Sequence, residues 1–213
     1  MRLPLFPLHV VLFPGRPLPL HLFEPRYRVM LADCLAADRR FGVVAIKAGR
    51  EVGGDAEIFD VGTVAAIESV TELADGRCDI VTRGVQRFRV RGLLDGAPYL
   101  VGDVELLDEP PASTEDEQLA SRLHELLVPY LADLGAPAEL LDRLPAQPSA
   151  LSWLAASAIQ VEVREQQRVL ECESLTGRLV RVLQVLRREA ALMRHLGTVA
   201  SLRPPGPGGS ELN

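Results

Sequence analysis

The sequence is poor in lysine, cysteine and aromatic residues. Lys47 is the only lysine among 213 residues, so any chemistry that needs a lysine amine must use this side chain. Cys34, Cys78 and Cys172 are odd in number and stand in no CxxC or Cys/His spacing. They predict neither a disulfide framework nor a structural zinc site, and we expect three buried, unreactive thiols.

Long apolar runs are also absent. No stretch approaches the roughly 18 apolar residues of a membrane span, and prolines interrupt the N-terminal stretch where a signal peptide has a plain apolar run. We therefore expect a cytoplasmic protein with no membrane partner. The formal net charge of -6 disfavours broad binding to nucleic-acid phosphates, which requires clustered Lys and Arg.

Metal-binding and catalytic motifs are missing from the pattern. The four histidines show no HxH or HExxH spacing, so no metal site is predicted. The acidic group Asp55, Glu57 and Asp60 is too sparse for a calcium loop and is more typical of a solvated loop. Nothing in the spacing of serines, cysteines and histidines indicates a hydrolase. We expect no cofactor.

The first half of the chain has the pattern of a β structure. Short β-like runs alternate with Gly, Pro and Asp, Asp75-Gly76 and Asp95-Gly96 predict turns, and a further reversal is expected near Arg83-Gly84. One helix is expected from Pro25 to about Asp38. Many short strands favour a closed or partly closed barrel, because closure removes exposed strand edges. Strands are expected at Leu3–Leu8, Pro17–Phe23, Phe41–Ile46, Val61–Leu73, Cys78–Thr82, Val85–Leu94 and Tyr99–Leu107.

The second half has the pattern of a helical bundle. Ser113 and Thr114 ahead of Asp116 and Glu117 form a capping-box arrangement. Helices are expected at 114–134, 137–144, 149–171 and 174–196. The predicted fold class is α+β, with a β-barrel at residues 1–110, a helical bundle at 111–198 and a disordered, Pro- and Gly-rich tail at 199–213.

Four arginines mark a possible anion-binding strip. Arg87, Arg89 and Arg91 share one parity of the expected strand, opposite Phe88, and Arg83 lies close by. This parity predicts a basic, solvated face. Alternating strands often place arginine toward water without a ligand, so both readings stay open.

A second candidate surface surrounds the start of the first helix. Glu24 and Arg26 are expected to form a clamp there, with the Glu24 carboxylate near backbone N–H groups and with Phe23 and Tyr27 in the core. Prolines along the preceding strands can form a rigid edge beside a groove that suits an extended peptide. The candidate binding residues are Pro14, Pro19, Phe23, Glu24, Arg26 and Tyr27.

Several motifs resemble one known family. LPLFPL from Leu3, VLFPG from Val11 and PLHLFEPRY from Pro19 are similar in order and spacing to the N-terminal domain of Lon proteases. FGV at 41–43, VGT at 61–63, GVQRF at 84–88 and PYL at 98–100 continue the resemblance. It implies a PUA-like β-barrel, or pseudobarrel, followed by a helical bundle. In the full protease this module recognises substrates and helps the subunits assemble.

The resemblance implies binding without catalysis. No GxxxxGK[ST] loop occurs, and Lys47 lies in AIKAG, so we expect no ATPase. The serine and lysine of the Lon peptidase lie downstream of this domain, so we expect a stand-alone module that is not an enzyme. The predicted function is binding of unfolded or flexible protein segments, with delivery to a protease or adaptor. The alternative is a PUA-like protein that binds nucleic acid or a modified nucleotide. The oligomeric state stays open.

Overall fold

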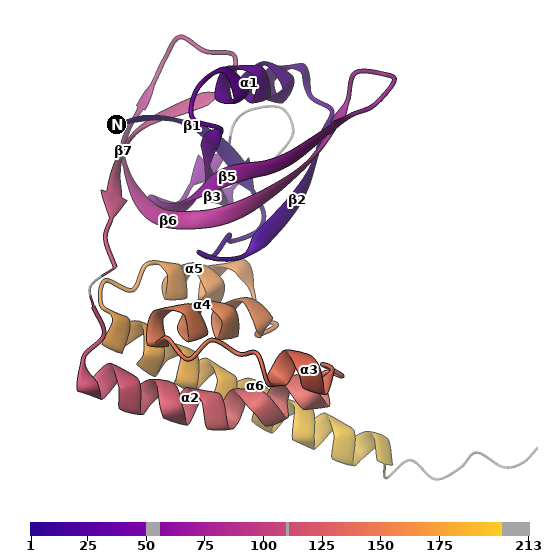
Figure 1. Cartoon of the computed structure of the whole chain (residues 1–213), viewed down its shortest axis with the longest axis vertical. Helices are drawn as coiled ribbons and strands as arrows, with labels where there is room; N and C mark the ends of the chain where they lie inside the picture. Colours follow the sequence, from indigo (N-terminus) through magenta and orange to yellow (C-terminus); the bar gives the residue numbers. More distant parts are fainter. Residues whose placement is uncertain (50–55, 110, 202–213) are drawn as a thin grey trace, which may run out of the picture.

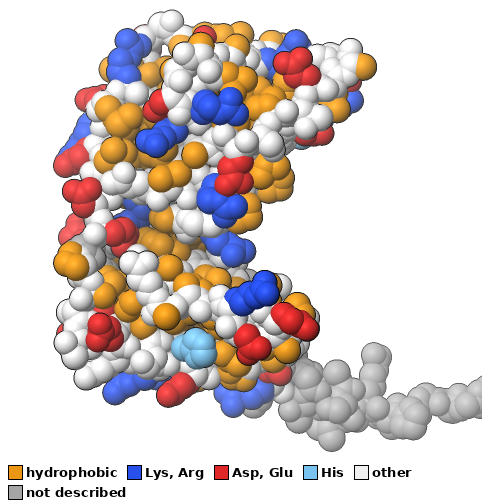
Figure 2. Space-filling model, viewed as in Figure 1, with side chains coloured by type: hydrophobic (Ala, Val, Ile, Leu, Met, Phe, Trp, Pro, Cys, Tyr) orange, Lys and Arg blue, Asp and Glu red, His pale blue; other side chains and the backbone are white. Residues whose placement is uncertain are grey.

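The computed structural model describes residues 1–49, 56–109 and 111–201, which form a β part and a helical part (Figure 1). The chain crosses from sheet to helices between Leu107 and Thr114. The outline narrows between the two parts, and charges of both signs are mixed over the face in Figure 2.

The β part contains β1 (Arg2–Leu8), β2 (Pro17–Leu22), α1 (Pro25–Ala36), β3 (Arg40–Ala48), β4 (Glu57–Ile58), β5 (Val61–Glu72), β6 (Cys78–Leu94) and β7 (Leu100–Leu107). The helical part contains α2 (Thr114–Asp133), α3 (Ala138–Leu141), α4 (Pro148–Ala158), α5 (Val163–Leu170) and α6 (Leu175–Ser201).

The strands form one mixed sheet in which β1 pairs with both β7 and β3. The order is β1-β7-β6-β5-β3-β4, β2 pairs with β6, and β1 also pairs with β3. The β1–β3 pairing is parallel, whereas β1–β7 is antiparallel. Leu5, Phe41 and Phe88 are fully buried on this sheet. The mixture of sheet and helices agrees with the predicted α+β class.

The predicted reversal near Arg83-Gly84 is wrong, because β6 runs through it without a break. A Cβ atom on Gly84 would lie 2.4 Å from the carbonyl oxygen of Phe13. The Gly84 backbone also exchanges hydrogen bonds with the loop before β2, through Gly15 N–H at 2.8 Å and the carbonyl of Arg16 at 2.9 Å. Glycine is therefore required here for close backbone contact rather than for a turn.

The other two predicted turns join adjacent antiparallel strands. At Asp75-Gly76, Gly76 has φ 78° and Leu73 N–H donates to the Arg77 carbonyl at 2.8 Å. At Asp95-Gly96, Gly96 has φ 110°. Positive φ at both glycines explains why these positions lack a side chain.

The helical part follows the prediction at its start but departs from it later. Ser113 and Asp116 form the predicted capping box, each accepting from the backbone of the other. The single helix expected at 149–171 is two helices, because Ile159 is extended at φ -74° and ψ 127° while its side chain stays in the core. The break turns α5 toward the sheet, where Gln167 Nε2 donates to the Val61 carbonyl at 3.0 Å. Tertiary contacts thus override a locally helical pattern.

The last helix is longer than expected. α6 continues to Ser201, so residues 199–201 of the expected tail are helical. The remainder of that tail, 202–213, lies outside the described residues, as does Asp55 of the acidic group. Across the described ranges, no helix is both long and apolar enough to cross a membrane.

Candidate functional site

The strands β1 and β2 and the start of α1 enclose a hollow of about 220 Å³, here called the β1–β2 pocket. Four of the six predicted binding residues line it. Its floor and walls combine apolar rings and proline with a few polar groups. The lining residues are Phe6, Pro7, Leu8, Pro19, Leu20, His21, Phe23, Glu24 and Tyr27.

The two aromatic residues of the predicted site differ in burial. Tyr27 is buried as predicted and stacks on Phe6 with ring centroids 4.1 Å apart. Phe23 is 53% exposed, so its predicted place in the core is wrong. Phe23 precedes the extended residue Glu24 and therefore lies outside the buried helical stripe that begins at Tyr27. An exposed phenylalanine beside an apolar hollow can contact a ligand.

Glu24 and Arg26 form the predicted clamp at the pocket rim. Arg26 Nε donates to Glu24 Oε2 at 3.0 Å, and both side chains are largely buried. The guanidinium also lies 4.5 Å from the centroid of the Tyr27 ring. The Glu24 side chain makes no capping bond to α1, so that part of the prediction is wrong. Pairing reduces the net charge at the mouth of the pocket.

A hydrogen-bonded chain orients His21 at the same rim. The guanidinium of Arg77, which can only donate, lies 3.3 Å from His21 Nε2, so this nitrogen is the acceptor. His21 Nδ1 then carries the proton and donates to Asp79 Oδ1 at 2.6 Å. The fixed ring stacks near Phe23 with centroids 6.2 Å apart. The polar rim therefore orients the His21 ring beside the exposed Phe23 side chain.

A second hollow of about 340 Å³ adjoins the first, and both are lined by Pro7 and Tyr27. Arg26 and the β6–β7 turn, residues 94–100, contribute to its wall. Tyr99 in this wall donates to Asp33 at 2.6 Å. Burial, assisted by this bond, raises the pKa of Tyr99 to about 12. We call the two hollows together the Tyr27 groove.

The free edge of β2 is unsuited to strand addition. β2 pairs with β6 over six consecutive positions, and Pro17 and Pro19 alternate with Leu18 and Leu20. Proline lacks an N–H, so the ladder to β6 uses the leucine positions, and the outward edge lacks donors at the proline positions. A peptide that binds here must therefore rely on side-chain contacts more than on backbone pairing.

Pro14 lies apart from the other predicted binding residues. It lines a hollow of about 370 Å³ between the β part and the helical part, together with Val85, Trp153 and Leu175. The structure thus gathers Pro19, Phe23, Glu24, Arg26 and Tyr27 in the Tyr27 groove and places Pro14 elsewhere.

The predicted arginine strip is largely neutralised. Arg83 pairs with Glu68 at 2.5 Å, Arg89 with Glu173 at 3.7 Å, and Arg91 with Glu105. Arg87 is only 3% exposed, so the predicted solvated face is wrong at this position. The hollow beside Arg87, Arg89 and Arg91 is also lined by the carboxylates of Glu105, Asp108, Glu171 and Glu173. This charge balance does not favour binding of a polyanion.

Arg87 instead belongs to a buried cluster that joins the two parts of the molecule. Its Nη1 atom donates to the carbonyls of Leu170 at 2.9 Å and Cys172 at 2.7 Å. Its Nη2 atom lies 3.1 Å from Glu109. Burial lowers the pKa of Arg87, opposed by the charge of Glu109.

Arg178 is the second cation of this cluster and is fully buried. It donates to both carboxylate oxygens of Glu109 at 3.0 and 2.7 Å, and to Ser152 at 2.8 Å. Its guanidinium lies 3.6 Å from the centroid of Trp153. Sequence reasoning did not identify Glu109 or Trp153, because a single acidic or aromatic residue carries no periodic signal.

The three cysteines and the single lysine differ in burial. Cys34 and Cys78 are buried as expected, but Cys172 is half-buried. Lys47 forms an exposed ion pair with Glu57 at 2.5 Å. Within the described part of the chain, no three His, Cys, Asp or Glu side chains converge so as to hold a metal ion.

Comparison with known proteins gives consistent matches. The family model described as "ATP-dependent protease La (LON) substrate-binding domain" matches residues 2–188. The chain is 32% identical to Lon protease 2 of Myxococcus xanthus over 199 residues, which are 90% of this chain and 24% of that protein. It is 25% identical over 200 residues to Lon protease of Escherichia coli K12, covering 91% of this chain and 26% of that protein. The chain thus spans about a quarter of these relatives.

Two solved structures resemble the fold. The crystal structure of a Lon N-terminal domain protein from Xanthomonas campestris matches with a TM-score of 0.65 and 29% identity, over 86% of this chain and 98% of that chain. The N-terminal domain of Mycobacterium avium complex Lon protease matches with a TM-score of 0.73 and 21% identity, over 88% and 98%.

Proposed function

The chain belongs to the LON substrate-binding domain family, and we propose that it binds unfolded or flexible protein segments in the Tyr27 groove. The observation that carries this proposal is the exposure of Phe23 beside an apolar pocket. The rest of the groove is preformed, because Tyr27 is stacked on Phe6 and Glu24 is paired with Arg26. A preformed site reduces the ordering cost of binding.

The β1–β2 pocket of the groove favours an apolar side chain of an extended segment, because most of its surface is apolar, whereas the second hollow is mainly polar. Covering the exposed part of the Phe23 side chain, roughly 100 Å², contributes about 2.5 kcal/mol at ~25 cal/mol per Å². The two adjoining hollows offer places for neighbouring side chains of one segment. Contacts of this size support weak, reversible binding, which suits a protein that samples many sequences.

The wider proposal is a recognition module without catalysis. We propose that it works in the cytoplasm and delivers bound segments to a protease or adaptor. We also propose that the curved sheet is a PUA-like barrel, with residues 1–110 and 111–198 as the two subdomains. The compensated arginines support a protein ligand over a nucleic acid.

Substitution of Phe23 tests the groove. A fluorescein-labelled, disordered peptide rich in Phe and Leu is titrated with wild-type protein and with Phe23→Ser, and fluorescence anisotropy gives Kd. We expect Phe23→Ser to weaken binding about tenfold to fiftyfold, because most of the ~2.5 kcal/mol of apolar contact is lost.

Val29→Ser is the matched control. Val29 is an apolar residue of α1 that is 45% exposed and does not line the groove. It should leave Kd unchanged, and thermal unfolding should be similar for all three proteins. Equal binding by wild type and Phe23→Ser would contradict the proposal.

A further inference from the structure

His21 lies at the rim of the β1–β2 pocket, and each of its two ring nitrogens has a charged neighbour. Nδ1 donates to Asp79 of β6 at 2.6 Å, and Nε2 lies 3.3 Å from Nη1 of Arg77. Arg77 is itself held by Asp75, whose Oδ2 atom accepts from Arg77 Nε at 2.6 Å. The His21 side chain is 42% exposed, so protons and ligands reach the ring from solvent.

A second proton on the His21 ring is incompatible with the contact to Arg77. Nδ1 already carries a proton toward Asp79, so the next proton binds at Nε2. The Arg77 guanidinium can only donate, and two N–H groups cannot hydrogen-bond to each other. Protonation therefore breaks the contact between His21 and Arg77 while the pair of Arg77 with Asp75 remains. The Nε2–H group of His21 then becomes a positively charged donor at the pocket rim.

The other charged groups near His21 come from α1. Glu24 and Arg26 at the pocket rim pair with each other. Arg28 lies against the β5–β6 turn, residues 73–77, because a Cβ atom on Gly76 would be 2.8 Å from its Nη2 atom. Carboxylates and guanidinium groups normally keep their charge between about pH 5 and 8, whereas imidazole does not. Protonation of His21 therefore adds one positive charge to a rim whose other charges stay constant.

The position of His21 relative to Phe23 indicates which ligands respond to this charge. The two ring centroids are 6.2 Å apart. In an extended chain, side chains two positions apart point to the same side and are separated by about 7 Å. A segment that places an apolar side chain against Phe23 can therefore place a carboxylate, two positions away, at Nε2 of His21.

We propose that His21 is a pH switch that changes the charge preference of the β1–β2 pocket. With His21 protonated, the pocket favours segments that carry a carboxylate two positions from the apolar residue. With His21 neutral, Nε2 faces Arg77 and this preference is lost. The inference rests on the proposed binding of protein segments in the Tyr27 groove and adds its regulation by pH.

NMR tests the switch without a ligand. The imidazole nitrogen shifts of ¹⁵N-labelled protein are followed from about pH 8 to pH 5, and the spectrum of His21→Gln assigns the His21 signals. We expect neutral His21 to carry its proton on Nδ1 and to gain the second proton on Nε2 within this range. A neutral ring with its proton on Nε2, or a ring that gains no proton in this range, would overturn the inference.

Two labelled peptides test the change in preference. Their cores are Glu-Ala-Phe-Ala-Glu and Gln-Ala-Phe-Ala-Gln, and the label is tetramethylrhodamine, whose emission is insensitive to pH in this range. Fluorescence anisotropy gives Kd for each peptide at pH 8 and at about pH 5.5, where glutamate is still mostly ionised. In wild-type protein the advantage of the glutamate peptide should grow about twofold to fivefold at the lower pH, as expected for one exposed ion pair.

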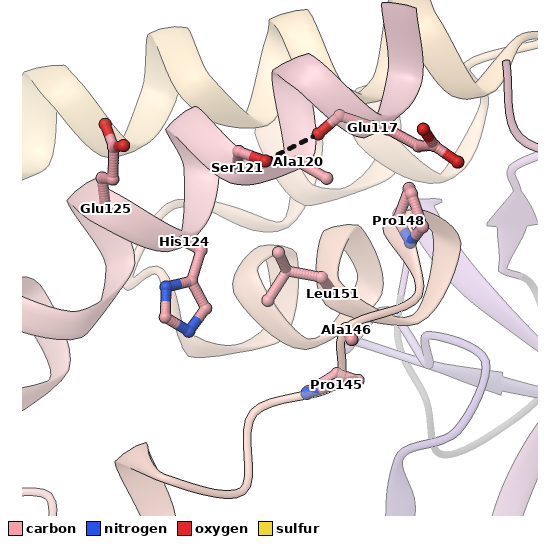
Figure 3. Close-up of a pocket in the computed structure, with 9 residues that line it drawn as sticks. All are labelled: Glu117, Ala120, Ser121, His124, Glu125, Pro145, Ala146, Pro148 and Leu151. Carbon is pink, nitrogen blue, oxygen red and sulfur yellow. Dashed lines mark hydrogen bonds between the residues drawn. The ribbon is translucent and has the colours of Figure 1, made fainter. Parts of the chain in front are cut away.

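His21→Gln and His124→Gln are the variant and its matched control. His124 lies on α2, beside a separate hollow of about 510 Å³ between α2 and α4 (Figure 3). The growth of the glutamate advantage should disappear in His21→Gln and persist in His124→Gln, with similar thermal unfolding of all three proteins. Equal growth in wild type and His21→Gln would overturn the switch alone. If neither peptide bound at either pH, the Tyr27 groove itself would be refuted, and the switch with it.

Discussion

Replacing Glu109 by glutamine should destabilise the protein strongly. Glu109 is the carboxylate that both buried arginines, Arg87 and Arg178, contact. Glutamine has nearly the same shape but no charge, and its amide group presents donors to guanidinium groups that can only donate. The substitution therefore removes electrostatic compensation without creating a cavity.

The magnitude follows from the burial of the partners. Arg178 is fully buried, and removal of one partner of a buried pair costs about 3–5 kcal/mol. The side chain of Glu109 is 30% exposed, so water screens part of the loss and the lower end of that range applies. We expect the free energy of unfolding to fall by about 3 kcal/mol. For a chain of this size this lowers Tm by about 6–12 °C.

The loss of stability caused by Glu109→Gln should become smaller as the pH falls. Burial raises the pKa of Glu109, but the hydrogen bonds and charge of Arg178, with Arg87, outweigh it and hold the pKa below the ordinary value of 4.5. A carboxylate with a lowered pKa stabilises the fold above its unfolded pKa and loses this contribution as pH falls through its folded pKa. The difference between wild type and Glu109→Gln should be constant at neutral pH and shrink below about pH 4.5.

Urea unfolding followed by circular dichroism at neutral and acidic pH measures both effects. Asp108→Asn is the control, because Asp108 is an exposed neighbour whose contact is a hydrogen bond from Gln86 at 3.2 Å. It should change stability by less than about 0.5 kcal/mol. If Glu109→Gln is no less stable than Asp108→Asn, or if their difference does not decrease in acid, the buried cluster does not hold the fold as argued.

Two further predictions concern packing and thiol reactivity. Gly84→Ala should lower the free energy of unfolding by roughly 2–3 kcal/mol in urea titrations, because its Cβ atom would meet the carbonyl of Phe13. Gly92→Ala is the control: a Cβ atom there has open space, so the free energy of unfolding should fall by less than about 1 kcal/mol. At pH 8 a thiol reagent should modify Cys172 but not Cys34, because burial raises the pKa of Cys34 to about 12. Peptide mapping by mass spectrometry measures the modification of each cysteine. Rapid modification of Cys34 in the folded protein would refute the assigned burial.

Local rules predicted the elements that depend on a few neighbouring residues. The turn at Asp75-Gly76 needs one glycine with positive φ, and the capping box needs Ser113 and Asp116 at the correct spacing. In both cases the interacting groups lie within a few positions of one another. The sequence alone therefore contains the relevant chemistry.

Long-range contacts account for the wrong predictions. Parity places Arg87 on one face of β6, but its partners Leu170 and Cys172 lie 83 and 85 positions later in the chain. Gly84 has the composition of a turn, yet its role is set by the backbone of Phe13. Phe23 was expected in the core because apolar residues are usually buried. The helix start at Pro25 was predicted, but the pattern did not show that Phe23, before the extended residue Glu24, lies outside the buried stripe of that helix.

The same limit applies to the candidate site. Pro19, Phe23, Glu24, Arg26 and Tyr27 are close in sequence, so their proximity could be predicted. Pro7 and the β6–β7 turn, which complete the Tyr27 groove, come from strands that only the sheet order brings together. The hollow between α2 and α4 could not be predicted from the sequence, because it is lined by small residues such as Ala120 and Ala146, which form no recognisable pattern.

The prolines of β2 have a consequence for behaviour at high concentration. An unpaired strand edge can form backbone hydrogen bonds with an extended chain or with another copy of the protein, and such pairing can start growth of β-fibres. Pro17 and Pro19 have no backbone N–H to donate, so the outward edge of β2 is poorly suited to such pairing. We therefore expect concentrated solutions of this protein to stay clear, and a segment bound in the proposed Tyr27 groove to be released rather than to co-aggregate with it.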